Sequence, residues 1–399
     1  MSNPFDFRLL ATDGRARRGQ VVTPHGIVDT PAFMPVGTQG IVKGMTERDL
    51  RESGAEIMLA NTYHLYLRPG DRLIARRGGL HRFSGWDGPI LTDSGGFQAF
   101  SLGPRRRILE DGICFRSHLD GSEHLLTPEL ATDIQARLGS DIAMAFDECL
   151  AQPATHEAAR ESMERTLRWA RRCRDRHHAL RDRPVDARMD DGVTLWRTNA
   201  GQVQFGIIQG GVFRDLREES AAKTVDIGFD AYAIGGLSVG EPNETMYEVV
   251  GFTAPLLPAD RPRYLMGTGT PFDLFECVAR GVDMFDCVMP TRNARNGQLF
   301  TARGPLNIKN ACYAEDDRPV DEACACYVCR RFSRAYLRHL FLAKEIGAST
   351  LNTLHNLHFY LDTLRRIRDA IAFGSFELLK DEFRQSYSLR PIVHDADDD

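Results

Sequence analysis

Short apolar runs that end in glycine or a polar residue recur along the first three-quarters of the chain. There are eight of them, and each has about the length of a buried β-strand. Amphipathic stretches separate most of the runs, and several open with helix-start residues, as at Thr127-Pro128, Thr155 and Thr270-Pro271. The runs occupy residues 32–38, 56–62, 89–96, 141–148, 204–211, 231–238, 263–269 and 284–290.

This alternation predicts an α/β fold, a (β/α)8 TIM barrel. Near-continuous apolar strands are typical of a parallel sheet covered on both faces, and eight strand–helix units in about 270 residues match the size of such a barrel. The alternative is a doubly wound sheet, but no GxGxxG motif opens a helix after the first strand. We therefore expect the polar residues at the strand ends to gather at one mouth of a barrel.

Two segments interrupt the barrel pattern. Residues 106–128 contain Asp-Gly at positions 111 and 120, which predicts an inserted β-hairpin or meander that rims the mouth of the barrel. Residues 174–203 are charged, contain proline and show little apolar periodicity. They are predicted to form a long surface loop after a helix at 155–173.

The pattern changes after Phe300, which suggests three regions. Residues 1–300 are predicted to form the barrel. Residues 301–387 are predicted to form a C-terminal zinc-binding subdomain, with helices from Arg330 to about Tyr387 that complete the fold. Residues 388–399 are an acidic tail, which we expect to be disordered.

The composition is that of an ordinary globular protein. A chain of 399 residues with 42% hydrophobic content buries one large core, or one core with a smaller appendage. The N-terminus lacks a signal-peptide pattern, and nowhere do about eighteen apolar residues stand together, so we expect a cytoplasmic protein without membrane spans.

The charge of the chain does not exclude a nucleic-acid partner. The formal net charge is −5, but four of the negative charges lie in the tail, so the body is close to neutral. Basic residues form two clusters, and each is either a solvated helix face or a nucleic-acid footprint. The clusters are Arg165, Arg168, Arg171, Arg172, Arg174 and Arg176, and Arg330, Arg331, Arg334 and Arg338.

Three of the nine cysteines, Cys324, Cys326 and Cys329, stand within six residues. This knuckle predicts a zinc site, because a tight turn aims three thiolates at one tetrahedral centre. A histidine from the following helices would complete it, and the spacing does not choose between His355 and His358, with His339 less favoured. Four protein ligands leave no open position for water, so the zinc is expected to be structural.

Acidic residues end several predicted strands: Asp93, Asp147 with Glu148, and Asp286. Each alone could cap a loop, but together with Gln209 and the glycine pairs they predict a polar site for a small planar ligand. Guanine fits, because its N1–H and amino group pair with a carboxylate such as Asp147. Its O6 would accept from Gln209 or from the backbone N–H of Gly236, while Phe97 and Met266 either cover the base or pack in the core.

The chain resembles the tRNA-guanine transglycosylases of the bacterial type, the queuine tRNA-ribosyltransferase family. The segments that carry the resemblance are GMTERDL, NTYHLYLRPG, LTDSGGFQ, FRSHLDGS, MAFDEC, GIIQGG, AIGGLSVGE, YLMGTGTP, MFDCVMPTRNARNG, CxCxxC and LHNLHFY. They span residues 5–385. Members of this family have a (β/α)8 barrel with a zinc-binding insert and are usually homodimers.

The resemblance implies an exchange of guanine at the wobble position of tRNAs with G-U-N anticodons, those for aspartate, asparagine, histidine and tyrosine. Asp286 would be the nucleophile that forms a covalent ribose ester, and Asp93 the general acid/base. Asp147, Gln209 and Gly236 would then read the base between Phe97 and Met266. The zinc ligands implied by the resemblance are Cys324, Cys326, Cys329 and His355.

The resemblance also implies the incoming base. Val239 and Cys149 favour 7-aminomethyl-7-deazaguanine over queuine, and the Leu237 backbone and Glu241 would meet its aminomethyl group. Arg292 and Arg295 match residues that contact the tRNA anticodon loop. Phe97 stands where many relatives have Tyr, and the loop at 174–203 is longer than expected.

Two other functions compete with this interpretation. A zinc-dependent base hydrolase or deaminase would need an open metal position, which a CxCxxC motif with a histidine argues against. A non-catalytic RNA-binding zinc protein would bind tRNA and never release guanine. Spacing alone would also allow Asp93 rather than Asp286 to attack.

Overall fold

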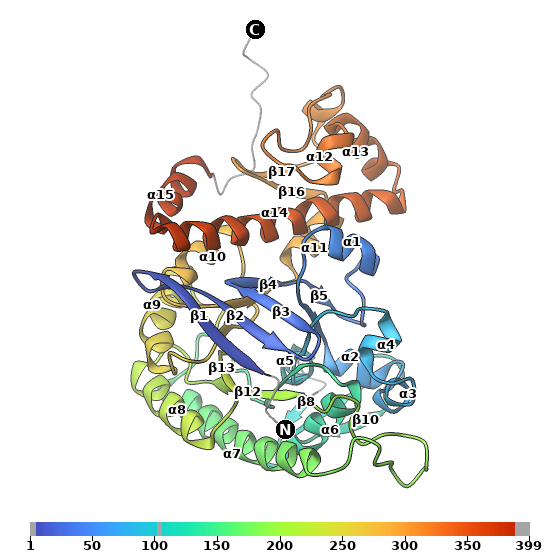
Figure 1. Ribbon diagram of the computed structural model, residues 1–399, viewed down its shortest axis with the longest axis vertical. Coiled ribbons are helices and arrows are strands. Elements are labelled where there is room, and N and C mark those ends of the chain that lie inside the picture. Colours follow the sequence, from blue (N-terminus) through green and yellow to red (C-terminus); the bar gives the residue numbers. More distant parts are fainter. Residues whose placement is uncertain (1–4, 102–105, 388–399) are drawn as a thin grey trace.

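Nine short strands, each parallel to its neighbours, form the central sheet (Figure 1). The computed structural model describes residues 5–101 and 106–387, and the predicted acidic tail lies outside them. The order along the sheet is β4-β15-β14-β13-β12-β11-β7-β6-β5. The strands are β4 (Ala32–Met34), β5 (Val36–Gly37), β6 (Met58–Ala60), β7 (Ile90–Thr92), β11 (Ile142–Met144), β12 (Val203–Ile208), β13 (Ala231–Ile234), β14 (Arg263–Leu265) and β15 (Met284–Asp286).

Strands β4 and β5 are two pieces of one strand that Pro35 divides. β4 pairs with β15 on one side, with Asp286 opposite Met34, and β5 pairs with β6 on the other. Proline lacks the N–H that a ladder needs, yet the Pro35 carbonyl still accepts from the backbone N–H of Leu59 at 3.0 Å. The two pieces close the ring, so the predicted (β/α)8 barrel is confirmed.

The strand residues divide between the inside and the outside of the barrel. Met34 and Val36 belong to the interior cluster, whereas Phe33, the residue before Met34, packs outward against the helices. Phe205 and Tyr264 are fully buried in the interior. The barrel is therefore a packed core, and space for a ligand lies only at its ends.

Helices connect the strands around the outside. The predicted helix starts are confirmed, because the hydroxyl groups of Thr127, Thr155 and Thr270 each accept from a backbone N–H three residues ahead. The helices are α1 (Glu47–Glu52), α2 (Thr62–Leu67), α3 (Asp71–Arg76), α4 (Leu80–Ser84), α5 (Gly96–Ser101), α6 (Pro128–Leu138), α7 (His156–Arg181), α8 (Arg214–Ile227), α9 (Asn243–Thr253), the 3₁₀ helix η2 (Ala254–Leu256), α10 (Pro271–Val278) and α11 (Met289–Arg295).

An antiparallel sheet that the sequence did not predict precedes the barrel. Its strands are β1 (Asp6–Asp13), β2 (Ala16–Thr23) and β3 (Gly26–Thr30). Phe7 joins the interior cluster of the barrel, and the Phe5 ring meets Phe205 at 5.7 Å, so this sheet covers the amino end of the barrel. Leu9 and Leu10 are about half exposed, so β1 lacks the apolar alternation that would predict a strand.

The segment after α5 is a three-stranded meander, as predicted. Its strands are β8 (Arg106–Ile108), β9 (Ile113–Arg116) and β10 (Glu123–Leu126), paired in the order β10-β9-β8. The first turn contains Gly112, whose carbonyl accepts from the backbone N–H of Leu109 at 2.9 Å.

The chain after β15 forms a hairpin and a set of helices beside the barrel. Figure 1 shows one long helix, α14, lying between the barrel and the hairpin. On α14, Tyr360 packs against Phe33 at 5.0 Å and against Phe300 at 5.3 Å. The elements are β16 (Gln298–Thr301), β17 (Gly304–Asn307), the 3₁₀ helix η3 (Ala311–Tyr313), α12 (Tyr327–Arg331), α13 (Arg334–Leu342), α14 (Ile346–Phe373) and α15 (Phe376–Ser386).

The helices predicted from Arg330 to about Tyr387 are therefore present. The hairpin lies across the boundary predicted at residue 300, and the division into domains stays a prediction. Within the described residues, no helix combines the length and the apolar character needed to cross a membrane.

The prediction of a surface loop over 174–203 was wrong for its first part. Helix α7 continues to Arg181, because Arg174, His177 and Leu180 are buried at helical spacing against the barrel. Residues 182–202 are irregular apart from one bridge, between Arg188 and Leu195. Because arginine and histidine occupy buried positions of this helix, its sequence lacks the apolar periodicity that would predict a helix.

Most of the arginine cluster on α7 attaches that helix to neighbouring elements. Five of its six members form ion pairs with other elements, while Arg168 is 51% exposed and Arg171 is exposed, so part of the cluster is a solvated helix face. The pairs are Arg165–Glu148, Arg168–Glu110, Arg172–Glu129, Arg174–Asp230 and Arg176–Asp133.

The ion pairs of α7 differ in burial, and we therefore expect them to contribute differently to the free energy of unfolding. Arg174 and Asp230 have side chains only 8% and 11% exposed and meet at 2.8 Å, so Arg174→Met leaves a buried carboxylate without its partner. We expect this change to lower the free energy of unfolding by about 3–5 kcal/mol. Arg168→Met is the matched control, because the Arg168–Glu110 pair is 51% and 58% exposed, and it should cost about 1 kcal/mol or less. Chemical denaturation of both variants checks this, and equal losses would contradict it.

Candidate functional site

The predicted site residues stand at the carboxyl ends of the barrel strands. Because all the barrel strands are parallel, these ends lie on one rim. Asp93 follows β7 directly, Gln209 follows β12, Met266 follows β14, and Asp286 is the last residue of β15. Asp147 lies three residues beyond β11, and Gly236 two residues beyond β13.

Four donors hold the carboxyl group of Asp93. Its Oδ1 accepts from the backbone N–H groups of Thr62 at 2.8 Å and Gly95 at 3.2 Å. Its Oδ2 accepts from the side-chain amides of Asn61 at 2.5 Å and Gln98 at 2.7 Å. Both oxygens of this half-buried group are therefore engaged.

The carboxyl group of Asp286 is held on one side only. Its Oδ1 accepts from the Tyr264 hydroxyl at 2.6 Å and from the backbone N–H of Gly267 at 2.7 Å. Among residues 5–101 and 106–387, no donor reaches its Oδ2. One oxygen is thus fixed in place and the other keeps its lone pairs for chemistry.

The surroundings of the two acids raise the pKa of both. Burial raises the pKa of Asp93 to about 6, hydrogen bonds from Asn61, Thr62 and Gln98 oppose this shift, and the nearby charge of Asp286 adds to it. Burial also raises the pKa of Asp286, and the bonds from Tyr264 and Gly267 oppose that shift. Both shifts bring the pKa of these acids closer to neutral pH, where a carboxyl group can both give and take a proton.

A second polar cluster joins β11 to β12. Gln209 donates from Nε2 to Asp147 Oδ2 at 2.8 Å, and the Ser94 hydroxyl donates to Asp147 Oδ1 at 3.3 Å. Both Asp147 and Gln209 are buried, and burial raises the pKa of Asp147 to about 6. Gly236 has φ +67°, and a Cβ there would lie 2.2 Å from Gln209 Oε1. Only glycine allows the amide of Gln209 to sit against this loop.

Glu241 closes the loop after β13. Its carboxylate accepts from the backbone N–H of Ser238 and from that of Val239 at 3.0 Å, and Leu237 beside them is buried. Cys149 is also buried, and burial raises the pKa of its thiol to about 12. This thiol is therefore a neutral side chain at physiological pH.

Phe97 and Met266, the two residues predicted to stack on a planar ligand, differ in solvent exposure. The Phe97 side chain is 53% exposed, which argues against a core-packing role. Met266 is half-buried and packs against the interior cluster on one side. Arg292 and Arg295 lie on α11, directly after β15: Arg292 is exposed, and Arg295 donates to the Thr291 carbonyl at 2.8 Å.

The predicted metal cluster is brought together away from these acids. The ligand atoms of Cys324, Cys326, Cys329 and His355 all lie within 4.8 Å of one another and could hold a metal ion. His355 Nδ1 faces the three sulfurs at 3.9, 3.5 and 3.3 Å, and its Nε2 donates to the Phe300 carbonyl at 2.7 Å. His339 and His358 are not part of the cluster.

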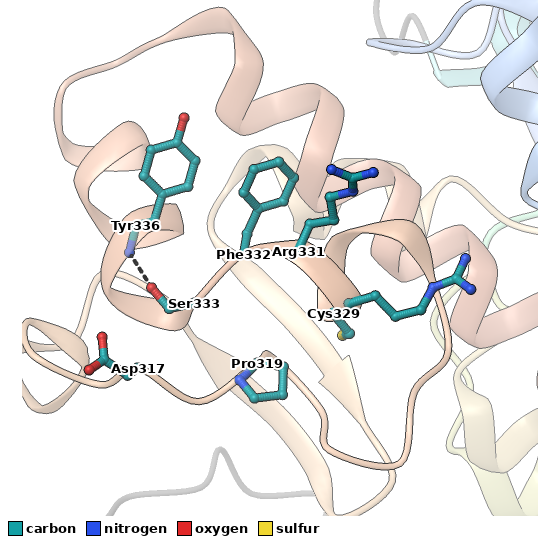
Figure 2. Close-up of a pocket in the computed structure, with 8 residues that line it drawn as sticks. Asp317, Pro319, Cys329, Arg331, Phe332, Ser333 and Tyr336 are labelled. Atoms are coloured by element: carbon teal, nitrogen blue, oxygen red, sulfur yellow. Dashed lines mark hydrogen bonds between the residues drawn. The ribbon is translucent and has the colours of Figure 1, made fainter.

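A cavity of 550 Å³ opens beside the metal cluster (Figure 2). The rings of Phe332 and Tyr336 stack there with centroids 5.3 Å apart, and Tyr336 is 44% exposed. The basic residues Arg330 and Arg331 lie along the same cavity. This exposed aromatic surface is separate from the acids at the rim.

Sequence reasoning missed the residues that hold the acids. Asn61 follows β6 at the same rim, and its position at a strand end would have indicated it. Tyr264 lies inside an apolar strand, and nothing in the sequence distinguishes it from a core residue. Arg217 was also missed: it is fully buried and donates to the carbonyls of Ile208, Gly211 and Gly235, which fixes the ends of β12 and β13.

Known proteins match nearly the whole chain. The sequence profile of a family described as queuine tRNA-ribosyltransferase matches residues 13–389. A queuine tRNA-ribosyltransferase of Solidesulfovibrio magneticus is 55% identical over 387 residues, which cover 97% of this chain and 99% of that protein. The corresponding protein of Nitratidesulfovibrio vulgaris is 56% identical, with 97% and 98% covered, and that of Cereibacter sphaeroides is 56% identical, with 94% of each covered.

The raised pKa of Asp147 predicts a pH-dependent stability. A carboxyl whose pKa rises from 3.8 to about 6 on folding reduces stability as the pH rises through that window, because the folded state must then bury a charge. Asp147→Asn removes this cost. The free energy of unfolding of the variant, relative to wild type, should therefore increase by roughly 2 kcal/mol between about pH 4 and about pH 8. Denaturation across this range measures it, with the exposed Asp260→Asn as the surface control, and a flat Asp147→Asn difference would contradict the shift.

Proposed function

Since this chain belongs to the queuine tRNA-ribosyltransferase family, we propose that it exchanges the wobble guanine of tRNAs with G-U-N anticodons for 7-aminomethyl-7-deazaguanine. The enzyme is a pentosyltransferase that acts on tRNA and a free base. The tRNAs are those for aspartate, asparagine, histidine and tyrosine, and the reaction belongs to queuosine biosynthesis.

One observation carries the assignment of roles, the unequal hydrogen bonding of the two acids. Asp93 accepts four hydrogen bonds, two on each oxygen, which stabilise it and hold its orientation. Asp286 accepts two, both on Oδ1. A nucleophile needs an oxygen with free lone pairs, so the asymmetry favours Asp286 for attack and Asp93 for proton transfer.

The first displacement forms an ester. Asp286 Oδ2 attacks C1′ of the wobble guanosine, the C1′–N9 bond breaks with its electrons moving to guanine, and Asp93 gives its proton to the departing base. The hydrogen bonds from Tyr264 and Gly267 keep the carboxylate oriented toward the sugar. The target base must first leave its stack, which costs a few kcal/mol and less in a loop than in a duplex.

The second displacement replaces the ester with the new base. N9 of the incoming base attacks C1′, the bond to Asp286 breaks, and Asp93 takes the N9 proton. Two inversions at C1′ retain its configuration, as in retaining glycosidases. The pKa of Asp93, about 6, suits a group that must both give and take a proton near neutral pH.

The Asp147 and Gln209 pair reads the base. In its ionised form Asp147 accepts from N1–H and the exocyclic amino group, and Gln209 then turns its N–H from Asp147 to donate to O6, together with the backbone N–H of Gly236. Phe97 covers one face of the base from its exposed position, and Met266 supports the other.

The choice of incoming base depends on the loop after β13. The carboxylate of Glu241 and the backbone at Leu237 receive the aminomethyl ammonium group, whose charge complements the acid. Glu241 is already fixed by Ser238 and Val239, so it needs little rearrangement. The resemblance at Val239 and Cys149 supports this base over queuine, whose substituent is larger.

Two surfaces complete the proposal. Arg292 and Arg295 on α11 lie directly after the nucleophile strand, where they contact phosphates of the tRNA anticodon loop. The exposed aromatic surface of Phe332 and Tyr336, beside Arg331, is of the kind enriched at subunit interfaces, and we assign it to a homodimer (Figure 2).

The metal of the Cys324 cluster is assigned as structural Zn²⁺, one per subunit. Zn–S bonds of about 2.3 Å and a Zn–N bond of about 2.1 Å in a tetrahedron give S···N edges of about 3.6 Å, and the observed edges are 3.9, 3.5 and 3.3 Å. Four protein donors fill the ion's positions, which opposes the hydrolase and deaminase alternatives. A bound ion would link the cysteine knuckle to α14 through His355.

Base exchange tests the function. The wild type should incorporate radiolabelled guanine into tRNAs with a G-U-N anticodon, and Asp286→Asn should lose at least about 10⁴-fold in rate while still binding tRNA. Tyr264→Phe is the matched control, because it removes one hydrogen bond and keeps the carboxylate. Since that bond lowers the pKa of Asp286, the acid limb of the rate profile should move to higher pH. Absence of exchange by the wild type, or exchange by Asp286→Asn, would refute the proposal.

Metal removal tests the structural role. A chelator, or Cys326→Ser, should lower the thermal stability of the whole protein, because α14 carries both His355 and Tyr360, which packs against the barrel. Circular dichroism should record lost helix in step with lost exchange. Loss of exchange with the helical signal intact would instead favour a catalytic metal.

A further inference from the structure

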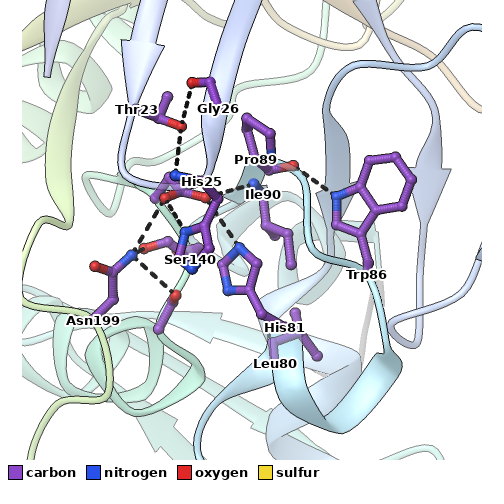
Figure 3. A network of polar contacts seen from close by, with 12 residues as sticks. Thr23, His25, Gly26, Leu80, His81, Trp86, Pro89, Ile90, Ser140 and Asn199 are labelled. Carbon is purple, nitrogen blue, oxygen red and sulfur yellow. Dashed lines mark hydrogen bonds and ion pairs between the residues drawn. The ribbon is translucent and has the colours of Figure 1, made fainter. Parts of the chain in front are cut away.

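A second cluster of metal-ligand side chains lies at the opposite end of the barrel from the acids (Figure 3). Asp141 immediately precedes β11, His25 lies on the turn between β2 and β3, and His81 lies on α4. Their candidate ligand atoms are all within 4.8 Å of one another. Neither the exchange chemistry nor the Cys324 cluster uses these residues.

Asp141 is the centre of this cluster. Its Oδ1 faces His25 Nδ1 at 2.6 Å, and its Oδ2 faces His81 Nε2 at 3.1 Å. Two amide donors hold the same carboxylate from the protein side: the backbone N–H of Ile90 at 2.9 Å and the side chain of Asn199 at 3.4 Å. Burial acts to raise the pKa of Asp141, but the hydrogen bonds and charges of the two histidines together lower it.

The cluster opens onto a cavity of 440 Å³. The side chain of Asp141 is fully buried, that of His81 is 12% exposed and that of His25 is 33% exposed, so the open side lies at the histidines. Asn199 and Arg82 also line the cavity. Arg82 is exposed, so water screens its charge.

We infer that His25, His81 and Asp141 form a second metal site, for a divalent transition metal that accepts imidazole ligands, such as Zn²⁺ or Ni²⁺. Two histidines and one carboxylate on one face of an ion are a recurrent donor set, and the remaining positions would take water from the cavity. Cis donors around an octahedral ion with bonds of about 2.1 Å lie about 3.0 Å apart. His25 Nδ1 lies 2.6 Å from Asp141 Oδ1, and His81 Nε2 lies 3.1 Å from Asp141 Oδ2, so small shifts of these side chains bring one oxygen and both nitrogens to an ion.

The surrounding groups suit such a site. Ile90 and Asn199 act as outer partners that keep the carboxylate oriented after the histidines turn from it to the ion. The two imidazole rings stack with centroids 3.6 Å apart and must tilt for both nitrogens to reach one ion. His25 is on a turn and borders the cavity, so it has the space to tilt. The bound ion would attach the N-terminal sheet to the barrel.

Metal titration tests the inference. The purified full-length protein, without a histidine tag and with its Cys324 cluster filled, is titrated with Ni²⁺ by calorimetry, and its metal content is then measured by mass spectrometry. We expect one equivalent of Ni²⁺ beyond the resident metal, and a rise in melting temperature with Ni²⁺ concentration. His25→Ala and His81→Ala should each weaken this binding by more than about tenfold, because even outer-shell changes cost about 10–100-fold.

His156→Ala is the matched control. His156 is a surface histidine, 44% exposed, that pairs with Asp215 at 2.8 Å, and its loss should leave Ni²⁺ binding unchanged. The resident metal content should stay constant in every variant, which shows that the fold and the Cys324 cluster are intact. Absence of the additional equivalent, or equal binding by wild type and His25→Ala, would show that these residues form only a hydrogen-bonded cluster.

Discussion

Closure of the parallel ladder is the constraint on which the site depends. Pro35 divides the first barrel strand, yet β4 still pairs with β15 and β5 with β6. If this strand were absent, β15 and β6 would be opposite edges of an open sheet, with Asp286 at one edge and Asn61 near the other. The closed ring instead places Asp286 close enough to Asp93 for its charge to raise the pKa of that acid.

Burial of charge then decides what each rim residue can do. Desolvation raises the pKa of Asp93, Asp147 and Asp286 alike, and the donors around each group distinguish them. Four donors fix Asp93, Gln209 and Ser94 hold Asp147, and Tyr264 with Gly267 holds a single oxygen of Asp286. The buried Arg217 holds the loops after β12 and β13 through the carbonyls of Gly211 and Gly235. Local hydrogen bonding therefore gives three similar acids three different environments.

Features set by local periodicity could be predicted from the sequence, whereas features set by contacts between distant residues could not. The eight barrel strands, the helix starts at Thr127 and Thr270, and the cysteine knuckle were all readable from spacing. The N-terminal sheet was missed because Leu9 and Leu10 face water. The end of α7 was missed because its buried face carries Arg174 and His177, and the ion-pair partner of Arg174, Asp230, lies outside the helix. Pairings such as Tyr264 with Asp286, or His25 with Asp141, exist only after folding.

The central claim is that Asp286 forms a covalent bond to the ribose, with Asp93 serving as the proton carrier. The most direct measurement is to incubate the wild type with substrate tRNA, denature and digest the complex, and locate the ribosyl ester by mass spectrometry. The account predicts an ester on the peptide that contains Asp286. An ester on Asp93, or complete exchange without any ester, would contradict it.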